Sequence, residues 1–160
     1  MASAKTDLAR IEALRDALMA AKNTYWADQA EIQRLAVAGW IARAEGRNDE
    51  AVALLRKAAD AEGATEKHPV TPGSIQPARE MLGELLLELN QPAKALAEFE
   101  ASQKTMPNRF RTIAGVATAA RAVGSVEAAK RYYRALAGLA VNGDGQRPEL
   151  AEAKTDLAQN

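Results

Sequence analysis

Apolar residues recur every three or four positions along most of the chain, which is the spacing of one face of an α-helix. Near the beginning this pattern comprises Leu8, Ile11, Leu14 and Leu18. We therefore predict a helix over 6–22, with Thr6 as its N-cap. A second helix is expected over 25–45, because Gly46 ends the next stretch of the pattern.

Six further helices follow from the same pattern and from the residues that start and stop helices. They are predicted over 48–62, 77–89, 92–106, 108–123, 125–140 and 148–158. Asn48, Asn108 and Ser125 are the expected N-caps. Residues 63–74 contain two prolines and two glycines, so we predict a loop there. Because the other connections are short, neighbouring helices are expected to pack antiparallel.

The positions that end helices recur at a fixed interval. Asn90 and Gly124 lie 34 positions apart, and Gly46 lies 44 before Asn90, which is the same interval plus ten residues in the predicted loop. Each break is preceded by a small residue and followed by an alanine and a large apolar residue: Gly39, Gly83 and Ala117, then Ala51, Ala95 and Ala129, then Leu55, Phe99 and Tyr133. Small side chains let two antiparallel helices cross closely, so we expect Gly39 to meet Ala51 and Gly83 to meet Ala95. The sequence therefore predicts three copies of a helix-turn-helix repeat.

This 34-residue helical repeat resembles the tetratricopeptide repeat. The middle copy matches the family's pattern best, at Leu82-Gly83, Leu86, Ala95, Phe99 and Pro107. The first copy has Leu35 where the family has Trp, and the third has Ala117 in place of Gly. The resemblance implies an all-α fold, a tetratricopeptide-like α-α superhelix. Such a fold is a right-handed solenoid of antiparallel helix pairs, here with extra N-terminal and C-terminal helices. A generic helical bundle is the alternative.

The same resemblance implies one domain over 1–160. Its parts are an N-terminal helix 6–22, repeats over 25–62, 75–107 and 108–141, an inserted loop 63–74, and a C-terminal capping helix 148–158. The runs EKHPVTPG, PARE and PNRF also resemble the C-terminal region of larger, uncharacterised bacterial tetratricopeptide-repeat proteins. If Met1 is the natural start, the charged first residues lack the apolar core of a signal peptide and indicate a cytoplasmic protein. If the chain is a fragment of a longer protein, export is the alternative.

The amino-acid composition limits the kinds of catalysis and binding that this chain can support. The chain has no Cys and one His, which argues against thiol catalysis, Cys-ligated metals and His-dependent acid–base centres. Lys plus Arg and Asp plus Glu each number 21, so no net charge attracts nucleic acid or an anionic membrane. No run of 18 apolar residues occurs. We therefore expect no enzyme, catalytic residue, cofactor or metal, no nucleic-acid partner and no membrane insertion.

In tetratricopeptide proteins the first helix of each repeat lines a concave groove, which usually takes an extended peptide or a partner helix. The resemblance places the lining positions of this chain at Gln33, Trp40 and Arg43, at Glu80, Glu84 and Leu87, and at Arg111, Thr118 and Arg121. A large aromatic such as Trp40 is a typical binding anchor, unless the loop or the first helix covers it. The charged residues have an alternative role, because they can pair with one another in water. The Lys, Asn and Arg clamp of chaperone-binding modules is absent, since Trp40, Glu80 and Glu84 are among the residues at those positions.

The loop 63–74 is a second candidate, because long loops in short-loop folds are often functional. We expect His68, Pro69, Thr71 and Pro72 at the edge of the groove, beside Trp40 or the second repeat. Pro69 and Pro72 also have the spacing of a polyproline ligand, and a stiff connector is the alternative. His68 near two glutamates is a poor metal site.

Two functions follow from these patterns. The first is a non-enzymatic scaffold that binds a protein or peptide partner in the groove. The alternative is a structural C-terminal cap of a longer solenoid, with no ligand of its own. Residues 104–134 are mainly basic and residues 79–100 mainly acidic. This asymmetry favours a partner with complementary charge, or a homo-oligomer.

Overall fold

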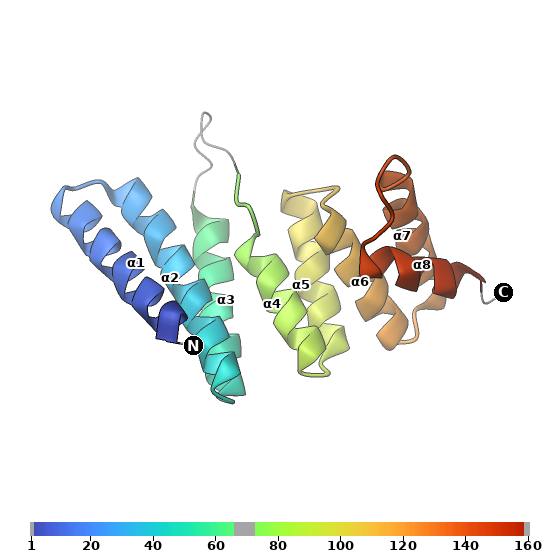
Figure 1. The fold of residues 1–160 in the computed structure, drawn as a ribbon, viewed down its shortest axis with the longest axis horizontal. Coiled ribbons are helices and arrows are strands. Elements are labelled where there is room, and N and C mark those ends of the chain that lie inside the picture. Colours follow the sequence, from blue (N-terminus) through green and yellow to red (C-terminus); the bar gives the residue numbers. More distant parts are fainter. Residues whose placement is uncertain (1, 66–72, 159–160) are drawn as a thin grey trace. The chain divides into compact units, whose positions relative to one another are not determined.

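The computed structural model describes residues 2–65 and 73–158, and these contain eight α-helices and no β-strand. The helices are α1 (Ala2–Ala20), α2 (Thr24–Ala44), α3 (Asn48–Ala64), α4 (Ala78–Glu88), α5 (Pro92–Thr105), α6 (Phe110–Ala122), α7 (Val126–Leu139) and α8 (Pro148–Ala158) (Figure 1). The predicted number and order of helices are confirmed for this part of the chain.

The chain divides into two compact units. The first, Met1–Leu82, contains α1 to α3 and the beginning of α4. The second, Gly83–Asn160, contains the rest of α4 and α5 to α8. The expectation of a single domain stays a prediction.

The three repeat breaks share one backbone geometry. Gly46, Asn90 and Gly124 have φ values of 80°, 54° and 81°. At each break two backbone N–H groups bond to carbonyls in the last turn of the preceding helix, from Gly46 to Arg43 and from Arg47 to Ala42 in the first case. The same pair of bonds recurs at Asn90 and Gly124, and again at Lys22 after α1. Such a left-handed residue satisfies terminal carbonyls of the helix. The predicted helix breaks at Gly46, Asn90 and Gly124 are therefore confirmed.

Four details of the helix ends differ from the sequence prediction. Thr6 is not an N-cap, because α1 already begins at Ala2 and the Thr6 hydroxyl donates to the Ala2 carbonyl. Asn48 is the first residue of α3, whereas Asn108 has φ 63° and precedes the cap position of α6. Helix α3 continues through residues 63 and 64, where the loop was expected to start. The first three differences arise because the side chains of Thr and Asn also serve inside helices and turns.

In the first unit α2 crosses α3 at a glycine. A Cβ placed on Gly39 would lie 2.9 Å from Leu55 Cγ and 3.3 Å from the Ala51 carbonyl oxygen. Leu55 and Ala51 are both fully buried. The predicted contact between Gly39 and Ala51 is confirmed, with Leu55 filling the adjacent space.

In the second unit the Phe99 ring of α5 is held between two glycines. A Cβ on Gly83 of α4 would lie 2.8 Å from ring atoms Cε1 and Cζ, and a Cβ on Gly115 of α6 would come still closer. The ring is fully buried. The nearest contact of Gly83 is therefore Phe99, one helical turn beyond the predicted Ala95. The large residue of the repeat thus packs on its own pair and on the next helix.

A side chain of α3 fixes the beginning of α4 within the first unit. The Glu62 carboxylate accepts the backbone N–H of Ala78 at 2.8 Å and also the hydroxyl of Ser74. Arg79 donates to Asp60 at 3.2 Å. A carboxylate suits the N-terminal end of a helix, where backbone N–H groups are unsatisfied. Successive helices are therefore linked by polar contacts as well as by packing.

We predict that Gly115→Ala lowers the free energy of unfolding by about 1–3 kcal/mol, because the added methyl group overlaps a ring that is gripped from both sides. Gly138→Ala is the matched control. Nothing lies within 4 Å of its added Cβ on α7, so it should raise stability by about 0.5–1 kcal/mol. Urea unfolding of both variants measures the difference. Equal effects would show that close approach at Phe99 is unimportant.

Candidate functional site

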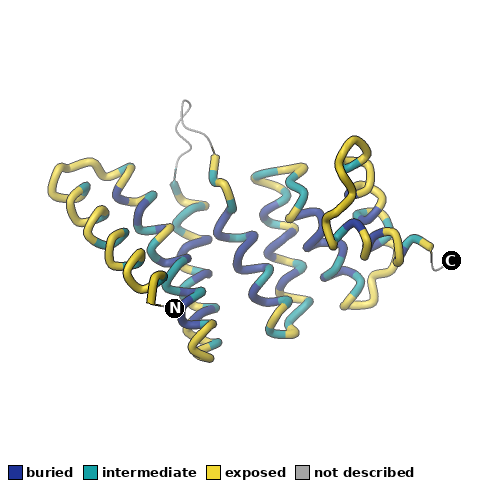
Figure 2. The backbone as a smooth tube through the Cα atoms, viewed as in Figure 1, coloured by how far each residue is buried: buried dark blue, intermediate teal, exposed yellow. Residues whose placement is uncertain are grey.

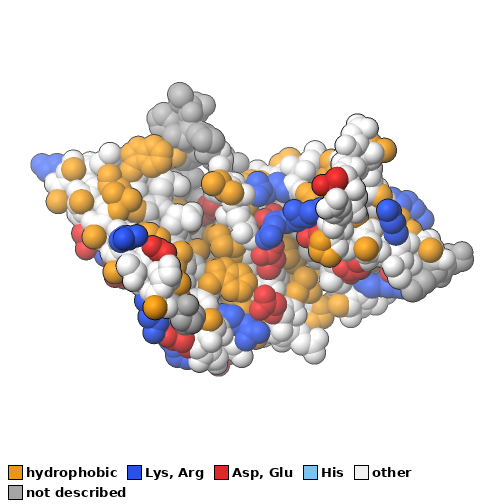
Figure 3. Space-filling view, viewed as in Figure 1, with side chains coloured by type: hydrophobic (Ala, Val, Ile, Leu, Met, Phe, Trp, Pro, Cys, Tyr) orange, Lys and Arg blue, Asp and Glu red, His pale blue; other side chains and the backbone are white. Residues whose placement is uncertain are grey.

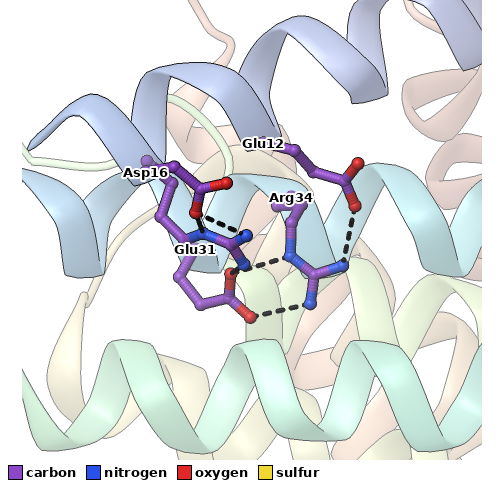
Figure 4. A network of polar contacts seen from close by, with 5 residues as sticks. Glu12, Asp16, Glu31 and Arg34 are labelled. Carbon is purple, nitrogen blue, oxygen red and sulfur yellow. Dashed lines mark hydrogen bonds and ion pairs between the residues drawn. The ribbon is translucent and has the colours of Figure 1, made fainter. Parts of the chain in front are cut away.

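Helix α1 is attached to α2 by a network of charged side chains (Figure 4). Glu31 of α2 receives two bonds from Arg34, each 2.7 Å, and one of 2.8 Å from Arg15 of α1. Glu12 of α1 lies 3.5 Å from Arg34, and Asp16 lies 2.8 Å from Arg15. The bonds from Arg34, and then those from Arg15, hold the pKa of Glu31 below its ordinary value.

A second ionic contact links the other ends of the two helices. Lys5 of α1 lies 2.6 Å from Glu45, which also contacts Arg47. Lys5 and then Arg47 lower the pKa of Glu45 to about 2. These contacts matter because α1 contains no buried residue in its 19 positions. Figure 2 shows its exposed and half-buried residues beside the buried core positions of the following helices.

An open, apolar cleft lies along α1 and the beginning of α2. Its volume is about 500 Å³. The lining residues are Ile11, Leu14 and Leu18 of α1 and Trp26, Gln29, Ala30 and Gln33 of α2. None of them is charged. Apolar side chains also cover this region in the space-filling view (Figure 3).

The large apolar residues at this cleft remain accessible to solvent. Leu14 is 56% exposed and Trp26 is 48% exposed, and the neighbouring Met19 is 53% exposed. Tyr25 packs its ring edge-on against Trp26, with centroids 5.2 Å apart. A contiguous apolar surface of this kind is typical of an interaction site.

The aromatic anchor expected from the sequence was Trp40, and not Trp26. Trp40 is half-buried on α2, and Trp26 is the exposed aromatic. Of the nine predicted groove residues, Gln33 is the one that lines this cleft. Trp26 was missed because it lies at the beginning of the predicted repeat 25–62, before Gln33, the first position that the resemblance assigned to the groove. An available signal was its position beside the apolar positions of α1, on the first turn of α2.

Several other predicted groove residues are engaged within the protein. Glu80 is fully buried, so its expected place on an open groove surface is wrong. Arg43 donates to Asn48 at 3.1 Å. Glu84 pairs with Arg111 at 2.9 Å in the second unit. Leu87 is half-buried. The alternative of mutual charge pairing is therefore confirmed for Glu84 and Arg111.

Helix α8 engages the last two predicted groove residues. Glu152 accepts hydrogen bonds from Thr118 at 3.1 Å and from the Tyr133 hydroxyl at 2.6 Å. Asp156, itself buried, receives the Arg121 Nε–H at 2.7 Å. Burial, and then the bond to Glu152, raise the pKa of Tyr133. Thr118 and Arg121 thus serve the docking of α8.

The predicted loop residues His68, Pro69, Thr71 and Pro72 lie outside the described residues. Across residues 2–65 and 73–158, no group of three or more acidic, His or Cys side chains is arranged to hold a metal ion. In the same ranges no helix has the length and apolar character of a membrane span.

Comparison with known proteins identifies the fold. No family model matches the chain, and no curated protein matches it. Among solved structures, PcrH from Pseudomonas aeruginosa is similar with a TM-score of 0.60 and 16% identity, over 79% of this chain and 88% of that chain. A MamA RS-1 ArsTM double mutant is similar with a TM-score of 0.54 and 16% identity, over 94% and 92%. Both belong to the tetratricopeptide-repeat class, so the chain has a tetratricopeptide-like α-α superhelical repeat fold.

We predict that Glu31→Gln increases local opening of α1 roughly two- to five-fold, because two arginines lose their shared carboxylate. The pKa of Glu31 is lowered in the folded protein, so its contribution is complete above the unfolded pKa and is lost as the pH falls through the folded value. Amide hydrogen exchange of α1 between pH 6 and 3 measures both effects. Glu127→Gln, at an exposed carboxylate on α7, should leave α1 unchanged.

Proposed function

We propose that this protein is a non-enzymatic scaffold for protein–protein interaction, with the cleft between α1 and α2 as its binding surface. The observation that carries the proposal is the apolar, uncharged lining of this cleft, with Leu14 and Trp26 about half exposed. Proteins with this repeat fold are typically non-enzymatic scaffolds, which supports a general role in protein interaction.

The chemistry of the cleft favours an apolar segment of a protein partner. Burying apolar surface contributes about 25 cal/mol for each Å² removed from water, and a half-exposed Trp is a strong anchor. Gln29 and Gln33 add amide groups that can both donate and accept hydrogen bonds. A charged ligand would gain no ionic contact from these lining residues.

We also propose that the binding surface continues along α2 toward Trp40 and Arg43. These residues follow Gln33 at intervals of seven and ten positions, which is close to two and three helical turns. The half-buried Trp40 can extend the apolar surface. Four of the remaining predicted groove residues are already paired within the protein, so their side chains are less available to a partner. They are Glu84, Arg111, Thr118 and Arg121.

A random peptide library displayed on phage tests the scaffold function, with this chain immobilised at low density. We expect enrichment of peptides with apolar residues, and at least a tenfold loss of their affinity in Trp26→Gln, because an anchor is removed. Leu139→Gln is the matched control, since Leu139 is 49% exposed on α7. Enriched peptides that bind the wild type and both variants equally would contradict the cleft assignment.

A second candidate function is supported by α8. Leu150, Ala153 and Asp156 of this helix are buried, while Ala151, Lys154 and Thr155 face solvent. A terminal helix with one buried and one largely polar face suits the cap of a helical repeat array. We propose structural capping as the alternative role of this segment.

We predict that Arg121→Ala lowers the free energy of unfolding by about 1–2 kcal/mol, because the buried Asp156 carboxylate loses a charged partner. Arg134→Ala removes an exposed charge from α7 and should change stability by less than about 0.5 kcal/mol. Thermal unfolding compares the two variants. Identical melting temperatures would contradict the capping role of the contact between Arg121 and Asp156.

A further inference from the structure

We propose that the cleft between α1 and α2 is covered by the same surface of a second copy of this chain, with the two α1 helices antiparallel. This inference rests on the proposed function in using the same cleft, and it names the partner. The interface would be isologous, so each contact occurs twice.

Helix α1 is poorly covered by the rest of the protein. None of its 19 residues is buried, and the residues that face α2 reach only partial burial. Leu14 and Trp26, which line the cleft, are each about half exposed. Monomeric soluble proteins rarely leave large contiguous apolar patches in water. A second apolar surface would remove these side chains from water.

Charged residues near the two ends of α1 also favour a second copy. Asp7 lies one helical turn before Ile11, and Lys22 lies in the turn that directly follows α1, so opposite charges flank the apolar stripe of this helix. Both charged residues are exposed. The hydrogen bonds from Ser3 and Arg10 to Asp7 are 3.4 Å long, which leaves its carboxylate able to accept a closer partner.

These ends match when two copies of α1 lie antiparallel. In the alignment that places Asp7 beside Lys22 of the second copy, Ile11 lies beside its Leu18. The two-fold axis then passes between positions 14 and 15, so both Leu14 side chains lie at the centre. A parallel arrangement would instead put equal charges together. The pattern therefore favours a second copy in antiparallel orientation.

Arg15 lies near this axis, so its positive charge must be balanced by carboxylates of its own copy. Arg15 would approach its own equivalent in the second copy. In each copy, however, Arg15 is bonded to Glu31 and Asp16 at 2.8 Å. These two carboxylates balance its charge, so the centre of the interface is not repelled by a pair of uncompensated arginines.

Sedimentation velocity from about 1 to 500 µM tests the pairing on the full chain. We expect a reversible dimer with a dissociation constant on the order of 1–100 µM, because the interface is small. Leu14→Gln should weaken association at least tenfold, whereas Leu139→Gln should leave it unchanged. A wild-type chain that stays monomeric at every concentration would overturn the inference, as would a dimer that is insensitive to Leu14→Gln.

A charge exchange tests the antiparallel orientation. Asp7→Lys makes both ends of the stripe basic and Lys22→Asp makes both acidic, so each variant alone should associate more weakly than wild type. An equimolar mixture should form a heterodimer, and the double variant D7K/K22D should recover wild-type association at low salt. No recovery in either case would overturn the proposed alignment. Circular dichroism checks that each variant is helical.

The peptide experiment separates this inference from the proposed function. If the chain is monomeric but Trp26→Gln still abolishes peptide capture, the dimer is wrong and the scaffold function stands. If the dimer forms as expected but no peptide depends on Trp26, the cleft serves self-association and the proposed binding of other partners is wrong.

Discussion

The structure depends on the close approach of helices at glycine. Phe99 is the clearest example, because its ring fits between Gly83 and Gly115 with no room for a methyl group on either side. Gly39 receives Leu55 in the same way in the first unit. Since dispersion attraction falls steeply with distance, such contacts require small residues at fixed positions. Gly39 and Gly83 occupy the same position in their repeats, so the close approach recurs with the repeat.

Helix α1 is held by a different interaction. Its apolar residues are only partly covered, and ion pairs centred on Glu31 and Glu45 fasten it to α2. Partly exposed ion pairs contribute little each, so α1 is attached less firmly than a helix with buried residues. The same partial burial creates the apolar cleft. The partial burial of α1 therefore accounts both for its weak attachment and for the apolar surface that a partner can bind.

Residue register predicted which positions face a neighbour, but not which neighbour would cover them. Glu80 illustrates the limit, because its position in the repeat suggested an open groove and the packed helices bury it completely. Thr118 and Arg121 were expected to meet a ligand, and they bond to α8 instead. Trp26 precedes Gln33, the first groove position that the resemblance assigned, so the sequence did not single it out, although it is the exposed aromatic of the cleft.

The sequence by itself determined the helices, their breaks and the crossing points, since these depend on local preferences and on spacing along the chain. Gly46, Asn90 and Gly124 adopt the left-handed conformation for this reason. The tertiary structure alone decided which surfaces stay open. Exposure depends on residues distant in sequence, such as Glu152 against Thr118, and their contacts exist only after the helices have packed.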